Sequence, residues 1–392
     1  MAERTHPWGT SPWTIDFHAA PQPIPTILDV AIIGGGFTGL AAAAWLQHIA
    51  PDRSVAVLEA ESIGAGASGR TGGVALSETA AGDMPGLRDV LKGFREIMQT
   101  LRVDCDLALS GAWEIARSGG RKDSPIAWSD SGTLRVTGEV EGGTIDPGKL
   151  VSGVARSAQD RGALIFENAR VDAIAFENPL RITTGGREIL ADQAVVATNA
   201  LSLELSALDE STSPKLTLAL STAPLTEQQI EAIGLAARKA FYTVDFPYLW
   251  GRMLRNNAAI FGCGLVDAPD WRDLHRLSVE KGKTKTLLDN LETRVRNLHP
   301  ALQKVKIAHR WGGPILLTEN WRPIFARRPL SERVIVAGGY CGHGVALSAY
   351  FGAWAAEAIL GRRELPKWKS PAAKVRKTSG TIVHSDLAKH RR

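Results

Sequence analysis

Three glycines, Gly34, Gly36 and Gly39, have the spacing G-x-G-x-x-G, the pattern in this chain that most clearly predicts chemistry. In such a turn the first glycine permits a tight bend, the second lets the backbone approach a pyrophosphate, and the third lets a helix pack on a strand. The N–H groups at the start of the following helix add a partial positive charge that favours phosphates. The three glycines therefore indicate a site for a dinucleotide.

The spacing alone is a weak signal, because Gly64, Gly66 and Gly69 also satisfy it without a strand leading into them. The elements around Gly34 are therefore the stronger signal, and they form a complete strand–turn–helix–strand unit.

This unit begins with Val30–Ile33, a short apolar run typical of a parallel strand covered on both faces. Ala41–Ile49 continues as an Ala-rich helix, and Ser54–Leu58 is a second strand. Glu59 ends that strand twenty residues beyond Gly39, where a carboxylate can accept hydrogen bonds from a ribose. The complete unit favours dinucleotide binding over an ordinary glycine-rich loop.

A second glycine-rich loop, Gly64–Gly73, follows Glu59 closely and contains Arg70 as its only charged residue. Its glycines and other small residues imply backbone packed closely against something flat or narrow. A flexible linker is the alternative, but an arginine in a loop after a ribose-binding strand favours a contact with the cofactor.

A third glycine turn, Gly338–Leu347, follows an apolar strand expected at Val334–Ala337. It leads into a helix expected to run to about Leu360, so a second helix N-terminus is directed toward a negatively charged group. His343 lies between two glycines at the mouth of this helix. We expect His343 to approach the cofactor closely; a structural histidine that caps the turn is the alternative.

The composition is that of a soluble globular protein, with 392 residues, 44% hydrophobic and 22% charged. The net charge of +5 is concentrated after residue 366, in a segment without a pattern of interleaved aromatics, so we expect a solvated tail and no nucleic-acid partner. Three widely spaced cysteines indicate neither a disulfide framework nor a metal site and favour a reducing, cytoplasmic location. No signal peptide and no transmembrane run is recognisable.

The N-terminal segment, residues 1–26, contains five prolines and two tryptophans, Trp8 and Trp13. Because proline favours extended backbone, we expect an arm laid across the body with the tryptophans as anchors, or alternatively a disordered leader.

The rest of the chain predicts an α/β (α+β composite) protein with two domains that alternate in the sequence. Apolar periodicity predicts helices over 85–110, 227–237 and 278–298, and Asp146-Pro147 opens a further helix that runs to about Arg161. We assign residues 27–84, 145–213 and 319–362 to a Rossmann-like domain. We assign residues 85–144 and 214–318 to a substrate domain with a mixed or antiparallel sheet, and residues 363–392 to a basic tail.

Together the three glycine motifs resemble the FAD-dependent amine and amino-acid oxidoreductases of the D-amino-acid oxidase superfamily. The nearest likeness is to the gamma-glutamylputrescine oxidase-like members. The motifs are Ile32–Leu40, Gly66–Gly73 and Gly339–Leu347, and Trp311–Gly313 and the Trp-containing arm look similar too. The resemblance covers roughly residues 5–362 and implies a FAD-binding domain of the glutathione-reductase type.

The resemblance implies a role for each glycine motif. The first would hold the pyrophosphate, Glu59 the adenosine ribose, and Val171 the adenine through its backbone. The last would surround the N1–C2 carbonyl edge of the flavin, where a helix N-terminus and a nearby histidine stabilise developing negative charge. His343 and Arg70 are therefore the expected catalytic residues. The expected FAD contacts are Gly34, Gly36, Phe37, Thr38, Gly39, Glu59, Ala60, Ser68, Gly69, Arg70, Thr71, Gly72, Val171, Ala197, Thr198, Gly339, Tyr340, Gly342, His343, Gly344 and Val345.

The implied reaction is oxidation of a C–N bond in a small primary or secondary amine or amino acid, with a hydride passing from the α-carbon to flavin N5. The electrons then pass to oxygen or another acceptor. Such chemistry depends on positioning and a pocket of low dielectric more than on an acid–base pair. The expected pocket residues are Tyr248, Trp250, Trp311 and Tyr340.

This sequence departs from the family pattern in three ways. Residues 312–318 contain no cysteine to tether FAD as in sarcosine oxidases, so we expect non-covalent FAD. The segment Met253–Cys263 and its neighbours offer Arg252 and Arg255 but no lysine of the kind that activates oxygen, which leaves the electron acceptor open. The usual asparagine of the second glycine loop is Thr71.

Two other functions remain open at this stage. The first is an NAD-dependent dehydrogenase that uses the Gly34 turn, although the two later glycine motifs argue against it. The second is a flavoprotein in which FAD is structural and the second domain or the tail binds a partner.

Overall fold

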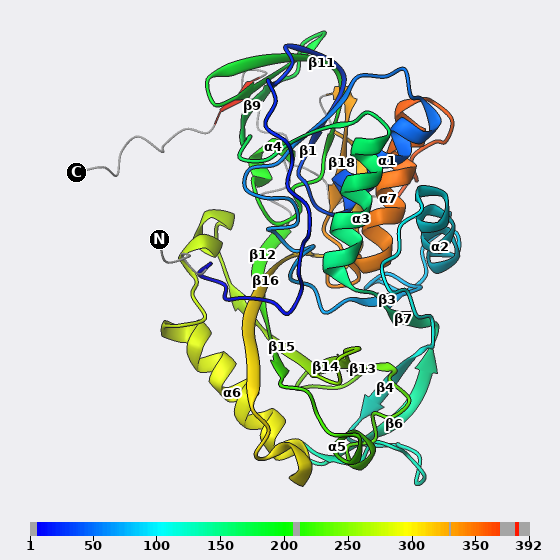
Figure 1. Ribbon diagram of the computed structural model, residues 1–392, viewed down its shortest axis with the longest axis vertical. Coiled ribbons are helices and arrows are strands. Elements are labelled where there is room, and N and C mark those ends of the chain that lie inside the picture. Colours follow the sequence, from blue (N-terminus) through cyan, green and yellow to red (C-terminus); the bar gives the residue numbers. More distant parts are fainter. Residues whose placement is uncertain (1–5, 207–211, 329–330, 369–380, 384–392) are drawn as a thin grey trace, which may run out of the picture.

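The computed structural model describes residues 6–206, 212–328, 331–368 and 381–383. Two large sheets dominate it, one in each half of the molecule (Figure 1). The predicted α/β class, with a second sheet of mixed type, is confirmed. No helix in these ranges is long and apolar enough to cross a membrane.

The nine-stranded sheet carries the Gly34 turn. Parallel pairing joins β1 to β2 and to β11, and β11 to β18. The carboxyl ends of these strands therefore meet at one edge of the sheet, where α/β proteins bind their ligands. Its strands are β1 (Ile27–Ile33), β2 (Val55–Leu58), β8 (Leu164–Phe166), β9 (Val171–Ala175), β10 (Leu180–Thr184), β11 (Arg187–Val196), β17 (Ile324–Arg328), β18 (Ser331–Gly338) and β19 (Thr381–Val383).

Both faces of β1 are covered, which explains its continuous apolar run. Val30 and Ile32 pack in a core with the helices, whereas Ala31 and Ile33 pack with residues of β9, β10 and β11. In Figure 1 the helices α1, α3 and α7 lie side by side over the first of these faces, with α2 outside them. Their bounds are α1 (Phe37–Ile49), α2 (Val90–Leu101), α3 (Pro147–Asp160) and α7 (Gly344–Ile359).

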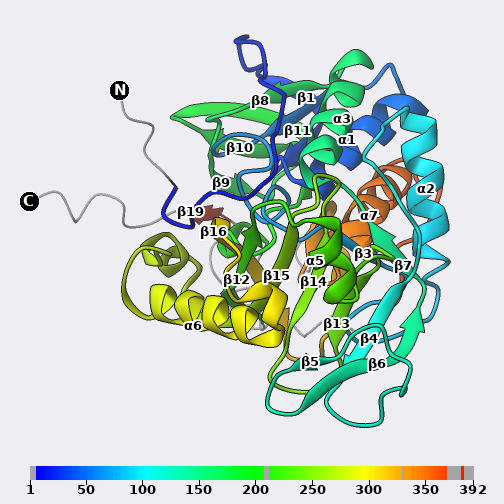
Figure 2. The same ribbon diagram turned by 60° about the horizontal axis from the view of Figure 1, so that its bottom comes forward.

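The eight-stranded sheet has the order β16-β12-β15-β14-β13-β4-β6-β5. One face packs on α6 (Gly282–Leu298) and α5 (Glu227–Ala232), as Figure 2 shows, and the other face meets the first half of the molecule. Its strands are β4 (Ala112–Ala116), β5 (Trp128–Ser129), β6 (Thr133–Val140), β12 (Thr212–Thr222), β13 (Ala240–Thr243), β14 (Trp250–Met253), β15 (Ala259–Asp267) and β16 (Ile307–Thr318). A two-stranded sheet of β3 (Val74–Leu76) and β7 (Gly142–Thr144) lies between the halves, and short helices occupy Leu203–Ser206, Trp271–Arg276 and Pro300–Leu302.

Three of the predicted helices are shorter than expected; α6 begins at Gly282 rather than at residue 278, and the other two differ more. α2 does not fill residues 85–110. The Asp89 side chain accepts from Lys92 N at 2.8 Å and caps the start of the helix, and Arg102 takes a left-handed φ of 57° that ends it. α5 ends well before residue 237, since Gly234 with φ +74° turns the chain away. The helix predicted to open at Asp146 is confirmed in detail: the Asp146 side chain accepts from Lys149 N at 2.9 Å and caps α3.

The arm, residues 6–26, runs extended over the body. Trp8 is buried and its indole N–H donates to the Leu274 carbonyl at 2.7 Å, while Trp13 donates to the Thr71 carbonyl at 2.8 Å. Much of the basic segment lies outside the described residues, apart from β19, which pairs with β9.

Candidate cofactor and substrate site

Gly34 and Gly39 are required by the fold itself. Gly34 has φ +108°, and a Cβ there would stand 2.8 Å from the Ala197 carbonyl oxygen. A Cβ on Gly39 would overlap the carbonyl oxygen of Gly34. These two glycines therefore let β1 turn directly into α1.

Gly36 has no such reason to be glycine. Its φ of −88° is available to any residue, and a Cβ would meet only the Ser68 side chain, with Oγ at 2.8 Å and Cβ at 3.8 Å. Ser68 Oγ also accepts from Phe37 N at 2.9 Å, so the first turn of α1 faces this space. The space over Gly36 fits the pyrophosphate that the motif predicts.

Glu59 lies beside this turn and is held by backbone groups. Its carboxylate accepts from Gly35 N at 2.7 Å and from Glu61 N at 2.9 Å. Burial raises the pKa of Glu59, and the two backbone hydrogen bonds oppose that rise. A fixed carboxylate here can accept from ribose hydroxyls. The neighbouring Ala60 is exposed, and Val171 is buried at the start of β9.

The end of β11 supplies a second sign of a ligand site. Ala197 N donates to the Ile33 carbonyl at 2.8 Å, which places Thr198 at the same edge as the Gly34 turn. Thr198 Oγ1 is buried and has no hydrogen-bond partner among the described residues. Because buried hydroxyls almost always find a partner, a bound group at this edge would satisfy it.

Sequence reasoning missed Asn199, which connects two distant strands. It has φ +48° and its Oδ1 accepts from Gly339 N at 3.0 Å. This bond joins the end of β11 to the turn after β18. Asparagine is enriched at positive φ, but nothing in the sequence indicates its partner.

The loop Gly64–Gly73 is fixed to its surroundings. Gly64 N donates to the Gly35 carbonyl at 2.9 Å, which ties the loop to the Gly34 turn. At the other end, Gly72 lies so close to the Trp250 ring that a Cβ would overlap it. Ser68 is thus brought to the first turn of α1 and Gly72 to the second sheet, and Ser68, Gly69, Thr71 and Gly72 stay predicted cofactor contacts.

Arg70 occupies a different place from the one expected. Its Nε donates to the Ala65 carbonyl at 3.1 Å and its Nη1 to the Gly9 carbonyl at 2.9 Å. Burial lowers its pKa to about 10. The guanidinium therefore lies under the arm, which argues against the catalytic role expected from the sequence; Arg70 holds the arm and loop together.

The turn after β18 has an unusual backbone. Gly339 and Gly342 have φ of +63° and +92°, and Gly344 and Val345 begin α7. His343 is the N-cap residue; its side chain makes no capping hydrogen bond to the helix, but its Nδ1 lies 3.4 Å from the Cys341 carbonyl oxygen within the turn, a contact that the structural alternative also predicts. Burial lowers the pKa of His343 below its usual 6.5, and the imidazole is therefore neutral at pH 7.

Tyr340 was expected both at the cofactor and in the substrate pocket. Its hydroxyl lies 2.7 Å from Thr38 Oγ1, and its ring packs in the core between the helices, near Phe351. Its role at the cofactor or in the substrate pocket stays a prediction. Thr38 is likewise buried in this contact.

One face of the eight-stranded sheet lies toward the half of the molecule that contains the nine-stranded sheet. A row of large side chains lies on this face. Trp250 pairs with Tyr242, and Tyr242 with Glu114, so the three lie on one face of adjacent strands. Tyr242 also donates to Glu114 Oε1 at 3.2 Å. Sequence reasoning missed Tyr242 and Glu114, although the alternation of side chains along β4 and β13 could have placed them on one face.

The other two predicted pocket residues differ in exposure. Burial of its phenol raises the pKa of Tyr248 to about 12, while part of the residue remains exposed at the loop before β14. Trp311 is only 1% exposed and packs with Trp13 and Trp250. Trp311 is therefore a core residue beneath the loop rather than an open pocket wall.

Arg252 lies next to Trp250 on the same strand and is 5% exposed. Its Nη1 donates to the carbonyls of Gly73 at 2.8 Å and Ile145 at 2.6 Å, and burial lowers its pKa to about 10. Arg255, by contrast, is exposed and pairs with Asp106 at 3.2 Å.

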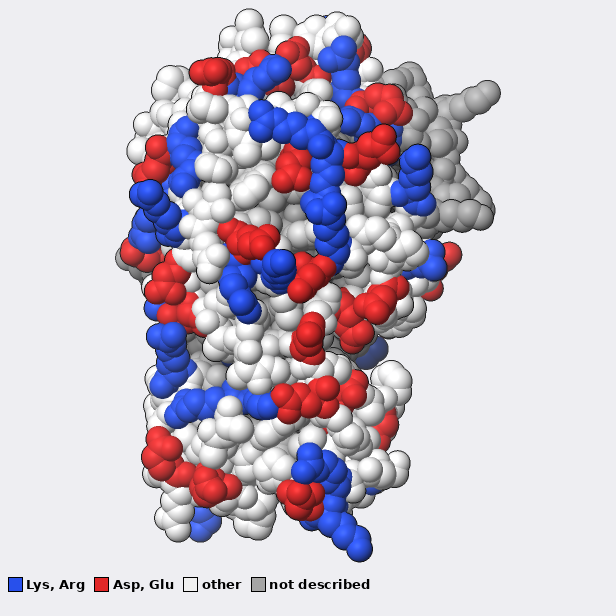
Figure 3. Space-filling model, turned by 90° about the vertical axis from the view of Figure 1, so that its right-hand side faces the viewer, with Lys and Arg blue, Asp and Glu red and all other residues white. Residues whose placement is uncertain are grey.

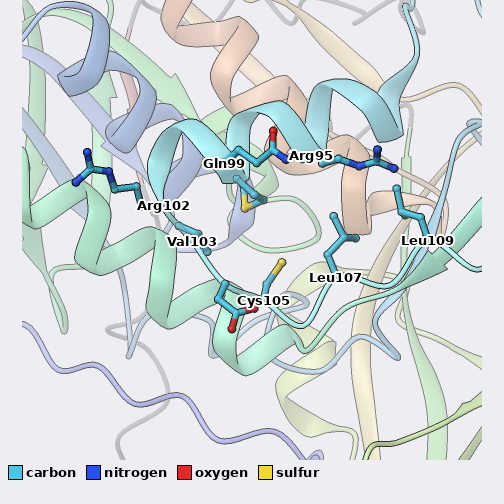
Figure 4. A pocket seen from close by; sticks show the side chains of 9 residues that line it. Arg95, Gln99, Arg102, Val103, Cys105, Leu107 and Leu109 are labelled. Carbon is cyan, nitrogen blue, oxygen red and sulfur yellow. The ribbon is translucent and has the colours of Figure 1, made fainter.

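Two hollows on the outer side of the helices contain none of the predicted site residues. One, of about 580 Å³, lies at the end of α2 and is lined by Arg95, Gln99, Arg102 and Leu107 among others (Figure 4). The second, of about 680 Å³, lies between α2 and α7. Figure 3, which views the side of the molecule where α2 lies, shows Lys and Arg interspersed with Asp and Glu. Within the described ranges no group of three or more His, Cys, Asp or Glu could hold a metal.

The sequence of this chain is similar to those of known proteins. Gamma-glutamylputrescine oxidoreductase of Escherichia coli (strain K12) is 29% identical over 387 residues, which cover 86% of this chain and 84% of that protein. Glycine oxidase of Bacillus licheniformis is 22% identical over 374 residues, covering 87% and 95%.

Solved structures share the fold. Glycine oxidase from Geobacillus kaustophilus superposes with a TM-score of 0.69 at 18% identity, covering 87% of this chain and 96% of that one. L-proline dehydrogenase from P. horikoshii superposes with a TM-score of 0.70 at 19% identity, covering 88% and 96%. The model of the DAO family, FAD dependent oxidoreductase, matches residues 29–140 and 132–358. This chain belongs to the DAO family of FAD-dependent oxidoreductases.

Proposed function

We propose that this protein oxidises a C–N bond of a primary or secondary amine or an amino acid, with FAD bound non-covalently at the carboxyl edge of the nine-stranded sheet. The observation that carries the proposal is the first turn of α1, where only the rotatable Ser68 side chain lies over Gly36 and the helix N-terminus favours a pyrophosphate. The relatives named for gamma-glutamylputrescine and glycine oxidation support the substrate class.

Four segments would hold the cofactor. Gly36 and Ser68 would face the pyrophosphate, Glu59 would accept from the ribose, and Thr198 would donate its unpaired hydroxyl. The start of α7 would face the flavin. Residues 312–318 contain no cysteine, and the free cysteine in the neighbouring turn, Cys341, is buried with its Sγ accepting from Thr318 N at 3.3 Å, which supports a non-covalent cofactor.

Bound FAD supplies a two-electron acceptor for the substrate's α-hydrogen. The chain contributes electrostatics and exclusion of water. The N-terminus of α7 provides partial positive charge, and the buried neutral His343 adds a polar group without a fixed charge. These groups would favour negative charge at the cofactor without a separate acid–base pair.

The substrate would lie between the cofactor and the row of Trp250, Tyr242 and Glu114, with Tyr248 at the side. The Tyr248 phenol is protonated at neutral pH, as any tyrosine is, so it can donate a hydrogen bond. The carboxylate of Glu114 favours a substrate with a positively charged end, as a diamine derivative would have. We further propose a cytoplasmic location, two domains divided as predicted above, and oxygen or another acceptor for the electrons.

An anaerobic visible spectrum, recorded while amines are added, tests the proposal. The panel contains gamma-glutamylated diamines, sarcosine, glycine and D-amino acids. Bleaching of the flavin bands by one compound identifies the substrate, and readmitted air then shows whether oxygen is the acceptor. Flavin bands that no compound changes would favour structural FAD, and folded protein that binds NAD but not FAD would refute the proposed site.

Acid precipitation tests the linkage to FAD. We expect all of the yellow colour in the supernatant, because the bond is non-covalent. Colour that stays with the pellet would refute non-covalent binding.

A further inference from the structure

The outward side of the loop Gly69–Gly73 is bound by side chains that come from elsewhere in the chain. Ser11 Oγ donates to the Gly69 carbonyl at 2.8 Å, and Trp311 Nε1 donates to the Arg70 carbonyl at 2.9 Å. Trp13 Nε1 donates to the Thr71 carbonyl at 2.8 Å. The arm and the second sheet therefore fix this loop through its backbone.

Arg252 completes the arrangement from the second sheet. Its Nη1 binds the Gly73 carbonyl at 2.8 Å, and its guanidinium carbon lies 5.3 Å from the centre of the Trp13 ring. Trp250, two residues before Arg252 on β14, packs against Gly72. The Nε of Arg252 is buried and has no acceptor among the described residues, so this cation is held here by backbone carbonyls and an aromatic ring.

The orientation of these carbonyls determines where the amides point. In a trans peptide the C=O of one residue and the N–H of the next point in opposite directions. Because the Arg70 and Thr71 carbonyls point to Trp311 and Trp13, the N–H groups of Thr71 and Gly72 point away from those rings. In the described part of the chain neither N–H donates to another group.

We propose that Trp13 is a positioning residue for FAD, with Arg252 stacked on it as its support. Trp13 fixes the Thr71–Gly72 peptide so that these N–H groups face the cofactor. Docking of the arm and binding of FAD are then coupled, and each favours the other by the same factor. This inference rests on the proposal that residues 64–73 line the FAD groove.

The first test is Trp13→Phe, which keeps an aromatic ring but removes the donor to Thr71. The matched control is Trp368→Phe, because Trp368 Nε1 also donates to a carbonyl, that of Pro85 at 2.7 Å, on the helix side of the molecule. FAD is titrated into apoprotein by flavin fluorescence at a temperature where thermal melts show both variants folded. We expect binding about 2- to 10-fold weaker for Trp13→Phe, the range for one lost hydrogen bond, and unchanged binding for the control.

The second test is hydrogen exchange of the wild-type protein with and without FAD, and it needs no variant. We expect FAD to slow exchange in residues 34–39, in 69–73 and in the arm around residues 11–14. Protection of 34–39 alone, or equal affinity of Trp13→Phe and wild type, would overturn the positioning role and leave the FAD site intact. Protection of neither glycine segment would overturn the proposed site and this inference together.

Discussion

Replacing Gly36 with alanine separates a glycine needed for the ligand from glycines needed for the fold. The added methyl would meet only Ser68, whose Oγ at 2.8 Å is the end of a rotatable side chain. The φ of −88° suits alanine, so the apoprotein loses only the better N-cap and part of the Phe37–Ser68 hydrogen bond. We expect a cost to apoprotein stability of about 1 kcal/mol.

The effect on FAD binding should be larger. If a pyrophosphate fills the space over Gly36, the methyl overpacks it, which typically costs about 1–3 kcal/mol. Since about 1.4 kcal/mol corresponds to a tenfold change, FAD should bind roughly 5- to 150-fold more weakly. Titration of apoprotein with FAD, followed by flavin fluorescence, measures this change directly.

Gly39→Ala is the matched control, because its Cβ would overlap the Gly34 carbonyl oxygen within the protein itself. This variant should lose thermal stability already as apoprotein, whereas Gly36→Ala should melt within a few degrees of wild type. If Gly36→Ala folds and binds FAD with unchanged affinity, the pyrophosphate does not lie over Gly36 and our placement of the cofactor is wrong.

Three further predictions concern stability and substrate binding. Asp130→Asn should destabilise the protein by about 1.5–3 kcal/mol in a denaturant titration, because it removes the carboxylate shared by the half-buried guanidinium groups of Arg117 and Arg294, of which Arg117 keeps Asp245; a loss below about 1 kcal/mol would contradict this. The pKa of His6 is lowered to about 4, mainly by burial, so the folded protein binds fewer protons than the unfolded one between pH 6.5 and 4. Stability should therefore fall as the pH falls through this window, and His6→Gln should flatten the dependence of Tm on pH there. Tyr248→Phe should lower kcat/KM about 3- to 10-fold with the FAD content unchanged, and equal kinetics would remove Tyr248 from the pocket.

The parts of the fold that the sequence predicts well depend on local chemistry. The Gly34–Gly39 turn and the Asp146 cap each involve residues within a few positions of one another. The end of α2 was harder to predict, because apolar residues such as Cys105 continue in the buried loop after Arg102. Hydrophobic periodicity reports burial and does not by itself report where a helix stops.

The candidate site was harder to predict than the fold, because its contacts join residues that are far apart in the sequence. Arg70 and Tyr340 have the right residue types for their expected roles, but their partners, Gly9 and Thr38, are far away in the sequence. Only the tertiary fold brings these groups together. Arg252 illustrates the same point, because its contacts with loop carbonyls leave no trace in the sequence of the loop.

The parallel pairing of β1, β11 and β18 determines when the cofactor site can form during translation. The proposed cofactor contacts begin at Gly34 and end at Val345, and β18 reaches its place only after β11. A nascent chain on the ribosome thus exposes an unfinished groove for most of its synthesis, and a strand made late completes it. Cofactor loading should therefore be a late event after translation. Cells short of riboflavin should accumulate full-length apoprotein rather than truncated chains.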